Sequence, residues 1–331
     1  MPQHGFSYQG YFKSMKEIQK EDLLLVSRHS SISPQGLQKV LDKAVYPNRE
    51  AWQRFISYGL MALGLGFTVA GILFFFAYNW VDLSKFAKLG IVQGLLLLGT
   101  LAALYPKFSK PLRDIILTGA AVLVGVVFAV FGQVYQTGAN AYDFFLAWTI
   151  FISIWVLVSK YAPLTLLYVI LIHTTLFLYS EQVAKDWSFI AICSLLVILN
   201  IGINILVALL QRYTTDWLTA PWFTKLISLA GLTFATLGIA YGIHSKLAPL
   251  FWLLLLLYTV LLVGNTIIAL KRHNSFLLAI NALSIIVLIC SLLFLIDEDM
   301  VFLLVSIFIV VAITLAVKGL LYLQQKWRKD G

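Results

Sequence analysis

Ten stretches of about 20 mostly apolar residues, separated by short polar segments, follow one another from position 56 to position 323. At a rise of about 1.5 Å per residue, each stretch can cross the roughly 30 Å hydrocarbon layer of a bilayer as an α-helix. The predicted spans are 56–80, 86–105, 115–135, 142–158, 162–180, 188–210, 223–243, 249–270, 275–296 and 300–323. Runs such as 251–258 (FWLLLLLY) are apolar on every side, whereas a transmembrane β-strand alternates apolar and polar residues. The pattern predicts an all-α fold, a polytopic transmembrane helix bundle.

The composition supports this fold class and excludes a soluble protein. Of the 331 residues, 60% are hydrophobic and only 12% are charged, and the mean hydropathy is +0.89. A soluble chain of this length needs a larger share of polar residues to cover its surface. In a membrane protein, the basic residues behind the net charge of +9 are first evidence for which loops lie on which side of the membrane.

The basic residues are distributed unevenly between the two sides of the predicted bundle. When each is assigned to the nearer end of a span, 20 of the 24 lysines and arginines fall on the side of the N-terminus. The exceptions are Lys85, Lys88, Lys185 and Lys246. Because loops rich in lysine and arginine stay in the cytoplasm, this split predicts that both termini are cytoplasmic. An even number of spans agrees, since it requires both termini on one side.

The spans and their flanks divide the chain into three regions. These are a cytoplasmic head over 1–55, spans one to five over 56–180, and spans six to ten with a short basic tail over 181–331. In the head, the composition of 15–28 predicts one helix, and Ser33 followed by Pro34 predicts the start of a second helix over 33–44. This helix pair is either a solvated anchor that helps to fix the orientation or a module that binds another protein.

The turn between the third and fourth spans carries several polar side chains and no lysine or arginine. On the third span, small residues at intervals of four lead to Gln133; they are Ala121, Gly125 and Ala129. We expect this stripe to pack tightly and to present the Gln133 amide at its end. Other polar side chains reach the same depth from neighbouring spans. The candidate ligand-binding residues, which we call the outer polar cluster, are Asn79, Trp80, Gln93, Gln133, Tyr135, Gln136, Tyr142 and Asp143.

Two interpretations of the outer polar cluster remain open. In the first interpretation, the cluster forms a small polar pocket, open to the outside, for a solute or a lipid headgroup. Alternatively, its amides only cross-link helices, and its aromatic side chains, with Trp148, belong to the interfacial belt. The two interpretations differ in whether these side chains line a cavity or are packed against neighbouring helices.

Several segments of the first half share a recognisable sequence pattern. They are the run 132–138 (GQVYQTG), then Tyr142, Phe145, Leu146 and Trp148, then Asn79 and Trp80, and then Ile32 and Ser33 in the head. The pattern resembles the bacterial membrane-protein family catalogued as domain of unknown function 2157, over about residues 15–180. This resemblance implies a multi-pass protein of the bacterial inner membrane, and it implies no particular biochemical activity.

Two polar residues lie near the predicted centre of the bilayer. His173 is about 11 residues from the cytoplasmic end of span five, and Asn200 is about 12 residues from the outer end of span six. An ionisable histidine at this depth is compatible with a proton relay. However, no charged residue lies at the midplane to accompany it, so we favour a neutral His173 that is hydrogen-bonded to Asn200.

The sequence patterns that would indicate catalysis are incomplete. There is no glycine-rich loop ending in Lys-Ser/Thr and no His-Glu-x-x-His on any predicted helix. Tyr142-Asp143 has the form used by intramembrane aspartyl proteases, but no Gly-x-Gly-Asp follows to supply the second carboxylate. The acidic run 297–299 is too short for a calcium loop, and Cys193 and Cys290 lack the paired spacing of a zinc site. We therefore expect no enzymatic activity, no metal and no cofactor.

From the sequence, we expect an inner-membrane protein that binds or passes a small polar solute or a lipid headgroup on the outer side of spans one to four. The alternative is a structural or assembly subunit of a cell-envelope complex, in which the head and the outer polar cluster contact a membrane or envelope protein. The lipid bilayer is the expected partner in both cases. No nucleic acid is expected, because no basic groove is interleaved with aromatic residues.

Overall fold

The computed structural model describes residues 49–79, 81–210, 220–245, 250–296 and 300–330. The chain forms two compact units, Met61–Gln324 on the one hand and Met1–Leu60 with Gln325–Gly331 on the other. Of the second unit, the described residues are helical and form the first turns of α3 and the last turns of α12. The predicted head helices over 15–28 and 33–44 lie outside the described residues.

Ten long helices make up the described part of the chain, and no strand occurs in it. They are α3 (Arg49–Tyr78), α4 (Lys85–Leu104), α5 (Lys110–Tyr135), α6 (Ala141–Ser159), α7 (Ala162–Gln182), α8 (Phe189–Leu210), α9 (Pro221–His244), α10 (Phe251–Lys271), α11 (Ser275–Leu293) and α12 (Val301–Asp330). All ten are long and apolar enough to cross a membrane. Each predicted span falls on one of them, so the predicted fold class and number of spans are confirmed.

Three helices differ by more than three residues from their predicted spans at one end. Helix α3 begins at Arg49, seven residues before the predicted start at 56. Helix α5 begins at Lys110, five residues before the predicted start at 115, because Pro111 fits the first turn after the N-cap Ser109. Helix α12 continues to Asp330, beyond the predicted end at 323. In all three cases a more polar helical segment extends past the apolar core, and hydropathy does not detect it.

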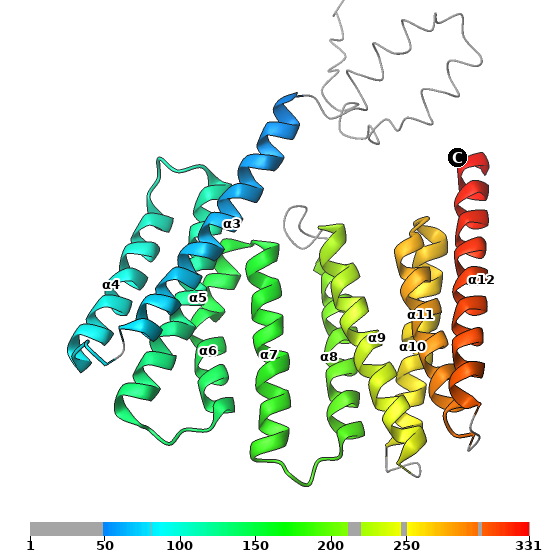
Figure 1. Cartoon of the computed structure of the whole chain (residues 1–331). Coiled ribbons are helices and arrows are strands. Elements are labelled where there is room, and N and C mark those ends of the chain that lie inside the picture. The colour runs from blue at the N-terminus through cyan, green and yellow to red at the C-terminus, as the bar shows by residue number, and fades with distance from the viewer. Residues whose placement is uncertain (1–48, 80, 211–219, 246–249, 297–299, 331) are drawn as a thin grey trace, which may run out of the picture. The chain divides into compact units, whose positions relative to one another are not determined.

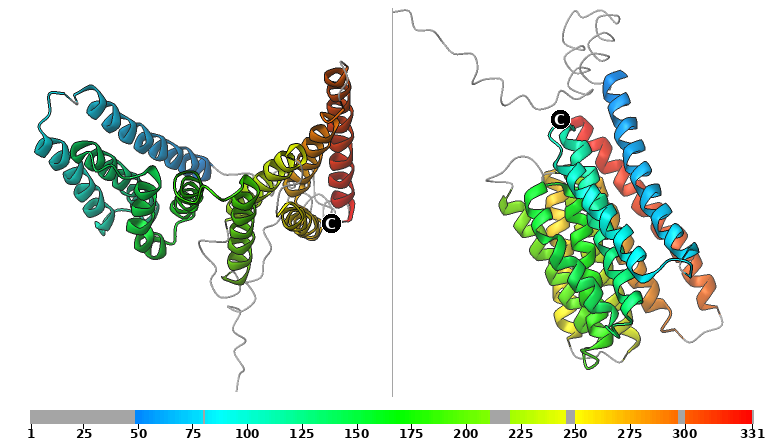
Figure 2. Two further views of the ribbon diagram at one scale, coloured as in Figure 1. Left: turned by 90° about the horizontal axis from the view of Figure 1, so that it is seen from below. Right: turned by 90° about the vertical axis from the view of Figure 1, so that its left-hand side faces the viewer.

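Within Met61–Gln324, the helices pack in two groups. Helices α4, α5, α6 and α7 contact their neighbours in sequence, and α8, α9, α10 and α11 pack against one another with α9 contacting the other three. Direct contact between α7 and α8 is sparse, but an apolar cluster of Val169, Val207, Phe223 and Ile227 joins α7, α8 and α9. Figure 1 labels the helices, and Figure 2 shows them from two further directions.

Consecutive helices run in opposite directions, so the loops alternate between two ends of the bundle (Figure 1). One end holds the loops 105–109, 160–161 and 272–274, and most of the described basic residues of this unit lie at or near it. We call this the basic end. The opposite end holds the loops 136–140 and 183–188. These names identify the ends without assigning them to a side of the membrane.

The small residues of α5 allow close packing in the first group. A Cβ atom added to Gly125 would lie 2.6 Å from the ring of Trp148 in α6, so the absence of a side chain makes room for the indole. The indole Nε1 donates a hydrogen bond of 2.7 Å to the carbonyl of Ala121. Trp148 is therefore an inter-helix packing residue in addition to any place it takes in an aromatic belt.

Candidate functional site

The outer polar cluster begins at the last turn of α5. Val134 is buried there, but Gln133, Tyr135 and Gln136 are exposed. Gln136 is the C-cap of the helix and has a left-handed backbone with φ 45°, a conformation that favours glycine. Along the small-residue stripe, Ala121 and Gly125 are buried, whereas Ala129 and Gln133 are exposed. Tight packing is therefore limited to the first part of the stripe, and the Gln133 side chain is exposed at its end.

Asp143 and Tyr142 at the start of α6 are held by local and inter-helix contacts. The Asp143 carboxylate accepts a hydrogen bond of 3.1 Å from the backbone N–H of Asn140, and the two residues form a capping box. The backbone N–H of Tyr142 donates to Oε1 of Gln182 at the end of α7, at 3.0 Å, and the Tyr142 ring packs edge-on against Tyr179. These contacts close the helix end, and Gln182 is a participant that the sequence did not single out.

The other described members of the cluster do not join this group through side-chain hydrogen bonds. The Asn79 amide donates to the carbonyl of Phe75, one turn earlier in its own helix, at 2.9 Å. Gln93 is exposed on α4, and Trp80 lies outside the described residues. Among the described residues, no side-chain hydrogen bond connects Asn79, Gln93, Gln133 and Gln136. A ligand-binding role for the cluster stays a prediction.

The predicted contact between His173 and Asn200 is present. Nδ2 of Asn200 lies 2.8 Å from Nε2 of His173, and Nδ1 of His173 lies 2.6 Å from the carbonyl oxygen of Val169. Because a carbonyl only accepts, Nδ1 carries the proton and Nε2 accepts from the amide, which is the pattern of a neutral imidazole. Asn200 is fully buried and also donates to the carbonyl of Leu196. The geometry is that of an inter-helix cross-link.

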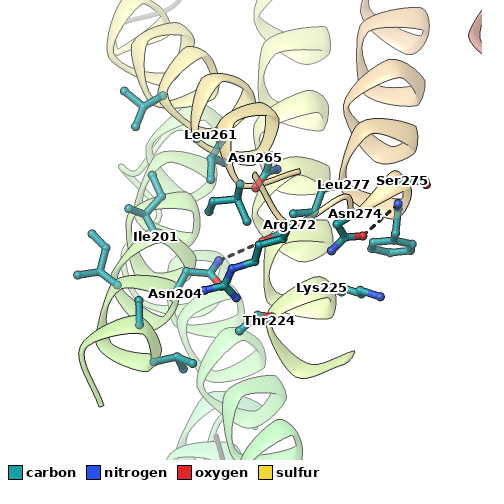
Figure 3. Close-up of a pocket in the computed structure, with 18 of the residues that line it drawn as sticks. Ile201, Asn204, Thr224, Lys225, Leu261, Asn265, Arg272, Asn274, Ser275 and Leu277 are labelled. Carbon is teal, nitrogen blue, oxygen red and sulfur yellow. Dashed lines mark hydrogen bonds between the residues drawn. The ribbon is translucent and has the colours of Figure 1, made fainter. Parts of the chain in front are cut away.

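A larger polar feature, which the sequence did not predict, lies at the basic end of the second helix group. It is a cavity of about 860 Å³ between α8, α9, α10 and α11 (Figure 3). Its lining consists of Ile201, Asn204, Ile205, Val207, Ala208, Thr224, Lys225, Ser228, Val260, Leu261, Gly264, Asn265, Ile268, Arg272, His273, Asn274, Ser275, Phe276 and Leu277. We call it the α8–α11 cavity. Its volume lies in the range of small-molecule sites.

The polar groups of the α8–α11 cavity are held in place by their neighbours. Nδ2 of Asn204 in α8 donates a hydrogen bond of 3.4 Å to the hydroxyl of Ser228 in α9. Asn265 is buried and donates to Oδ1 of Asn281 in α11, at 3.2 Å. At the mouth, the side chain of Asn274 caps α11 by accepting from the backbone N–H of Phe276. Three amides of the lining are therefore held in position by hydrogen bonds to neighbouring groups.

Two basic side chains belong to this lining, and they point in different directions. Figure 3 shows Arg272 extending from the end of α10 toward Asn204 of α8. Lys225 points away from Arg272, and its Nζ lies 5.8 Å from the centroid of the Phe276 ring. The other side of the cavity is apolar, with Ile201 and Leu261 among its side chains. The cavity thus combines a cationic, amide-rich part with an apolar part.

The sequence contained one signal for this site. Asn265 of α10 and the C-cap Arg272 are seven residues apart, which places two polar lining side chains along one helix face. In the sequence, Lys225 and Arg272 contribute only to the uneven distribution of basic residues, and Asn204 is one of several amides within the spans. Their convergence depends on the packing of four helices, and no single span contains that information.

The described residues contain no group of three His, Cys, Asp or Glu side chains that could hold a metal ion. Cys193 and Cys290 are free thiols, and neither is among the lining residues of the cavity. The polar side chains that line the α8–α11 cavity carry amides, hydroxyls, the His273 imidazole and the two cations.

One protein family matches a part of the chain that lies within its first half. Residues 27–165 match the family described as Predicted membrane protein (DUF2157), so the resemblance predicted from the sequence is confirmed over this range. The match covers the helices from α3 to α6 and the outer polar cluster, and it ends before the α8–α11 cavity. No curated protein and no solved structure matches the chain significantly.

Proposed function

We propose that this multi-pass membrane protein binds the headgroup of a membrane lipid in the α8–α11 cavity, and that it does so without catalysing a reaction. The observation that carries the proposal is the mixed lining of that cavity. A lipid presents a polar headgroup joined to apolar chains, and the cavity offers amides and cations beside aliphatic side chains. A fully water-soluble solute would leave the apolar part without a complementary surface.

The proposed location is the bacterial inner membrane, with both termini and the basic end on the cytoplasmic side. The distribution of lysine and arginine supports this orientation. In this orientation the α8–α11 cavity opens at the level of the cytoplasmic leaflet, where its ligand would enter from the lipid phase. Lateral entry is compatible with the short loop 272–274 at its mouth.

A glycine in the cavity provides a direct test. Gly264 lines the cavity, and a Cβ atom added to it meets no atom within 4 Å. Gly264→Phe should place a phenyl ring in the cavity, and so reduce the space for a ligand, without disturbing the backbone. Gly202→Phe is the matched control, because Gly202 also lies within a helix with no atom within 4 Å of an added Cβ but is not part of the lining.

The measurement is lipid retention by the purified protein, determined by native mass spectrometry after extraction in a mild detergent. We expect bound phospholipid in the unmodified protein and in Gly202→Phe, and at least tenfold less in Gly264→Phe at equal folding. Equal retention in all three proteins would refute the proposal and favour the alternative function below.

The alternative function is that of a structural or assembly subunit of an envelope complex. It is favoured by the exposure of large apolar side chains along α3 and α12, such as Phe67, Phe74, Phe302 and Val310. In that case these faces contact a membrane protein partner. The glycine experiment separates the two functions, because a partner on α3 or α12 is not displaced by filling the α8–α11 cavity.

A further inference from the structure

We infer that the α8–α11 cavity selects lipids whose headgroup carries a phosphate with a net negative charge, and that Arg272 contacts this phosphate. This inference rests on the proposed function and specifies its ligand class. It follows from the charge of the lining, the direction of two helix ends and the position of one guanidinium.

The charge of the lining favours an anion. Its described residues include Lys225 and Arg272 but no aspartate or glutamate. An anionic headgroup therefore meets complementary charge at Arg272, whereas the ammonium group of a zwitterionic headgroup would lie near that cation, with no carboxylate among the described lining residues to pair with it. The lining consequently discriminates between the two kinds of headgroup.

Two helices begin at this cavity and add to the preference. Helix α9 begins at Pro221 and contributes Thr224 and Lys225 from its first turns. Helix α11 begins at Ser275 and contributes its first three residues together with its N-cap Asn274. The N-terminus of a helix carries a partial positive charge, which stabilises a phosphate bound nearby.

Arg272 is the residue best placed for direct contact. Its side chain is exposed, and it extends into the space between α10 and α8 toward Asn204 (Figure 3). A guanidinium binds a phosphate through two parallel hydrogen bonds, which a lysine cannot reproduce. The amide of Asn204 lies on the opposite wall, where it can donate to another phosphate oxygen.

The apolar part of the lining favours a lipid over a free phosphate ion. Ile205, Val260 and Ile268 lie in the same cavity as the basic residues. An inorganic phosphate would occupy only the polar part and would leave these side chains in contact with water. Basic pockets between transmembrane helices on the cytoplasmic side are known to suit anionic lipid headgroups.

The test compares lipids that differ only in the headgroup with one another and with inorganic phosphate. The protein is reconstituted in nanodiscs of phosphatidylcholine, and binding is measured by displacement of a fluorescent phosphatidic acid. The competitors are phosphatidic acid, phosphatidylglycerol, phosphatidylcholine, diacylglycerol and inorganic phosphate. We expect the two anionic lipids to compete at concentrations at least tenfold lower than phosphatidylcholine or diacylglycerol, and inorganic phosphate to compete weakly.

Two adjacent cations supply the matched variants. Arg272→Gln should lower the affinity for anionic lipids about tenfold or more and remove the preference for them over phosphatidylcholine. Arg272→Lys should retain part of this preference. Lys271→Gln removes the same charge one residue earlier, at a position outside the lining, and should leave the preference unchanged. Equal loss in Lys271→Gln and Arg272→Gln would overturn the inference, because it would show a diffuse surface charge effect.

The remaining outcomes separate this inference from the proposed function. If lipids bind and Gly264→Phe removes them, but Arg272→Gln leaves the headgroup preference unchanged, the inference is wrong and the proposed function stands. If inorganic phosphate competes as well as phosphatidic acid, the ligand is a free anion and both fail. If no lipid binds the unmodified protein, the proposed function itself is refuted.

Discussion

Asn200 of α8 and His173 of α7 are joined by a hydrogen bond of 2.8 Å between Nδ2 and Nε2, at the boundary between the two groups of helices. The imidazole also stacks on the ring of Phe234 in α9, with centroids 5.4 Å apart. One side chain of the first group therefore contacts two helices of the second. This polar contact joins α7 to the second group together with the apolar cluster of Val169, Val207, Phe223 and Ile227.

Replacing Asn200 tests this contact. Asn200→Leu removes the donor to Nε2 of His173 and leaves that nitrogen without its partner, so we expect a loss of stability of about 1 kcal/mol, as for other hydrogen bonds between membrane helices. The measurement is thermal unfolding in detergent. A double-mutant cycle with His173→Gln isolates the pair energy, and a coupling near zero would contradict the cross-link.

The neutral imidazole pattern makes a second prediction about His173. His173→Gln should retain lipid binding, because the residue serves packing and does not transfer protons. The check is lipid retention beside protein yield. Loss of function in His173→Gln, with yield and thermal stability unchanged, would support the proton relay instead.

Gly125 should not tolerate even one added methyl group. A Cβ atom there lies 2.6 Å from the Trp148 ring, so Gly125→Ala should destabilise the protein by about 1–3 kcal/mol through overpacking. Gly99→Ala is the control, since its Cβ would lie 3.6 Å from Cβ of Ala120, an ordinary contact. Equal unfolding temperatures for the two variants would argue against the packing of α5 on α6.

Because Gln136 has a left-handed backbone, replacing it with glycine can test whether its side chain in the outer polar cluster serves stability or ligand binding. Gln136→Gly should stabilise the end of α5 by about 1 kcal/mol, because glycine adopts this conformation without strain. Gln133→Ala, at an exposed helical position, should change stability little. If the cluster binds a ligand, Gln136→Gly should lose binding while it gains stability. A loss of stability would show that the amide makes a structural contact.

The topology can be tested with reporter fusions. A reporter active only in the cytoplasm should work after Lys329 and within the segment 106–114, and it should fail within 136–141. The charge asymmetry of the loops is the physical reason. An active fusion at Asn140 would reverse the assigned orientation and would place the α8–α11 cavity in the outer leaflet.

The helices were predictable from the sequence because each is a continuous apolar segment whose length matches a bilayer. The sequence places the start of α5 five residues after its observed start. Lys110 and Arg113 lower the hydropathy of the first turn, although Pro111 fits a helix there. Packing was harder to predict. Gly125 was recognised as part of a small-residue stripe, but the identity of its neighbour, Trp148, depends on the three-dimensional arrangement of α5 and α6.

The candidate site illustrates the same limit. The contact of His173 with Asn200 could be predicted, because both residues lie at the same depth on consecutive spans. The α8–α11 cavity could not, since Lys225 and Arg272 have the sequence signature of ordinary loop charges. Only the packing of α8, α9, α10 and α11 brings them beside Asn204 and Asn265.

The central claim, a lipid headgroup in the α8–α11 cavity, is tested most directly by cross-linking a photoactivatable phosphatidic acid in nanodiscs and mapping the modified residues by mass spectrometry. The account predicts cross-links concentrated within 201–208 and 260–277, suppressed by unlabelled phosphatidic acid and lost in Gly264→Phe. Cross-links spread evenly over the exposed faces of α3 and α12, insensitive to competitor and to Gly264→Phe, would contradict it.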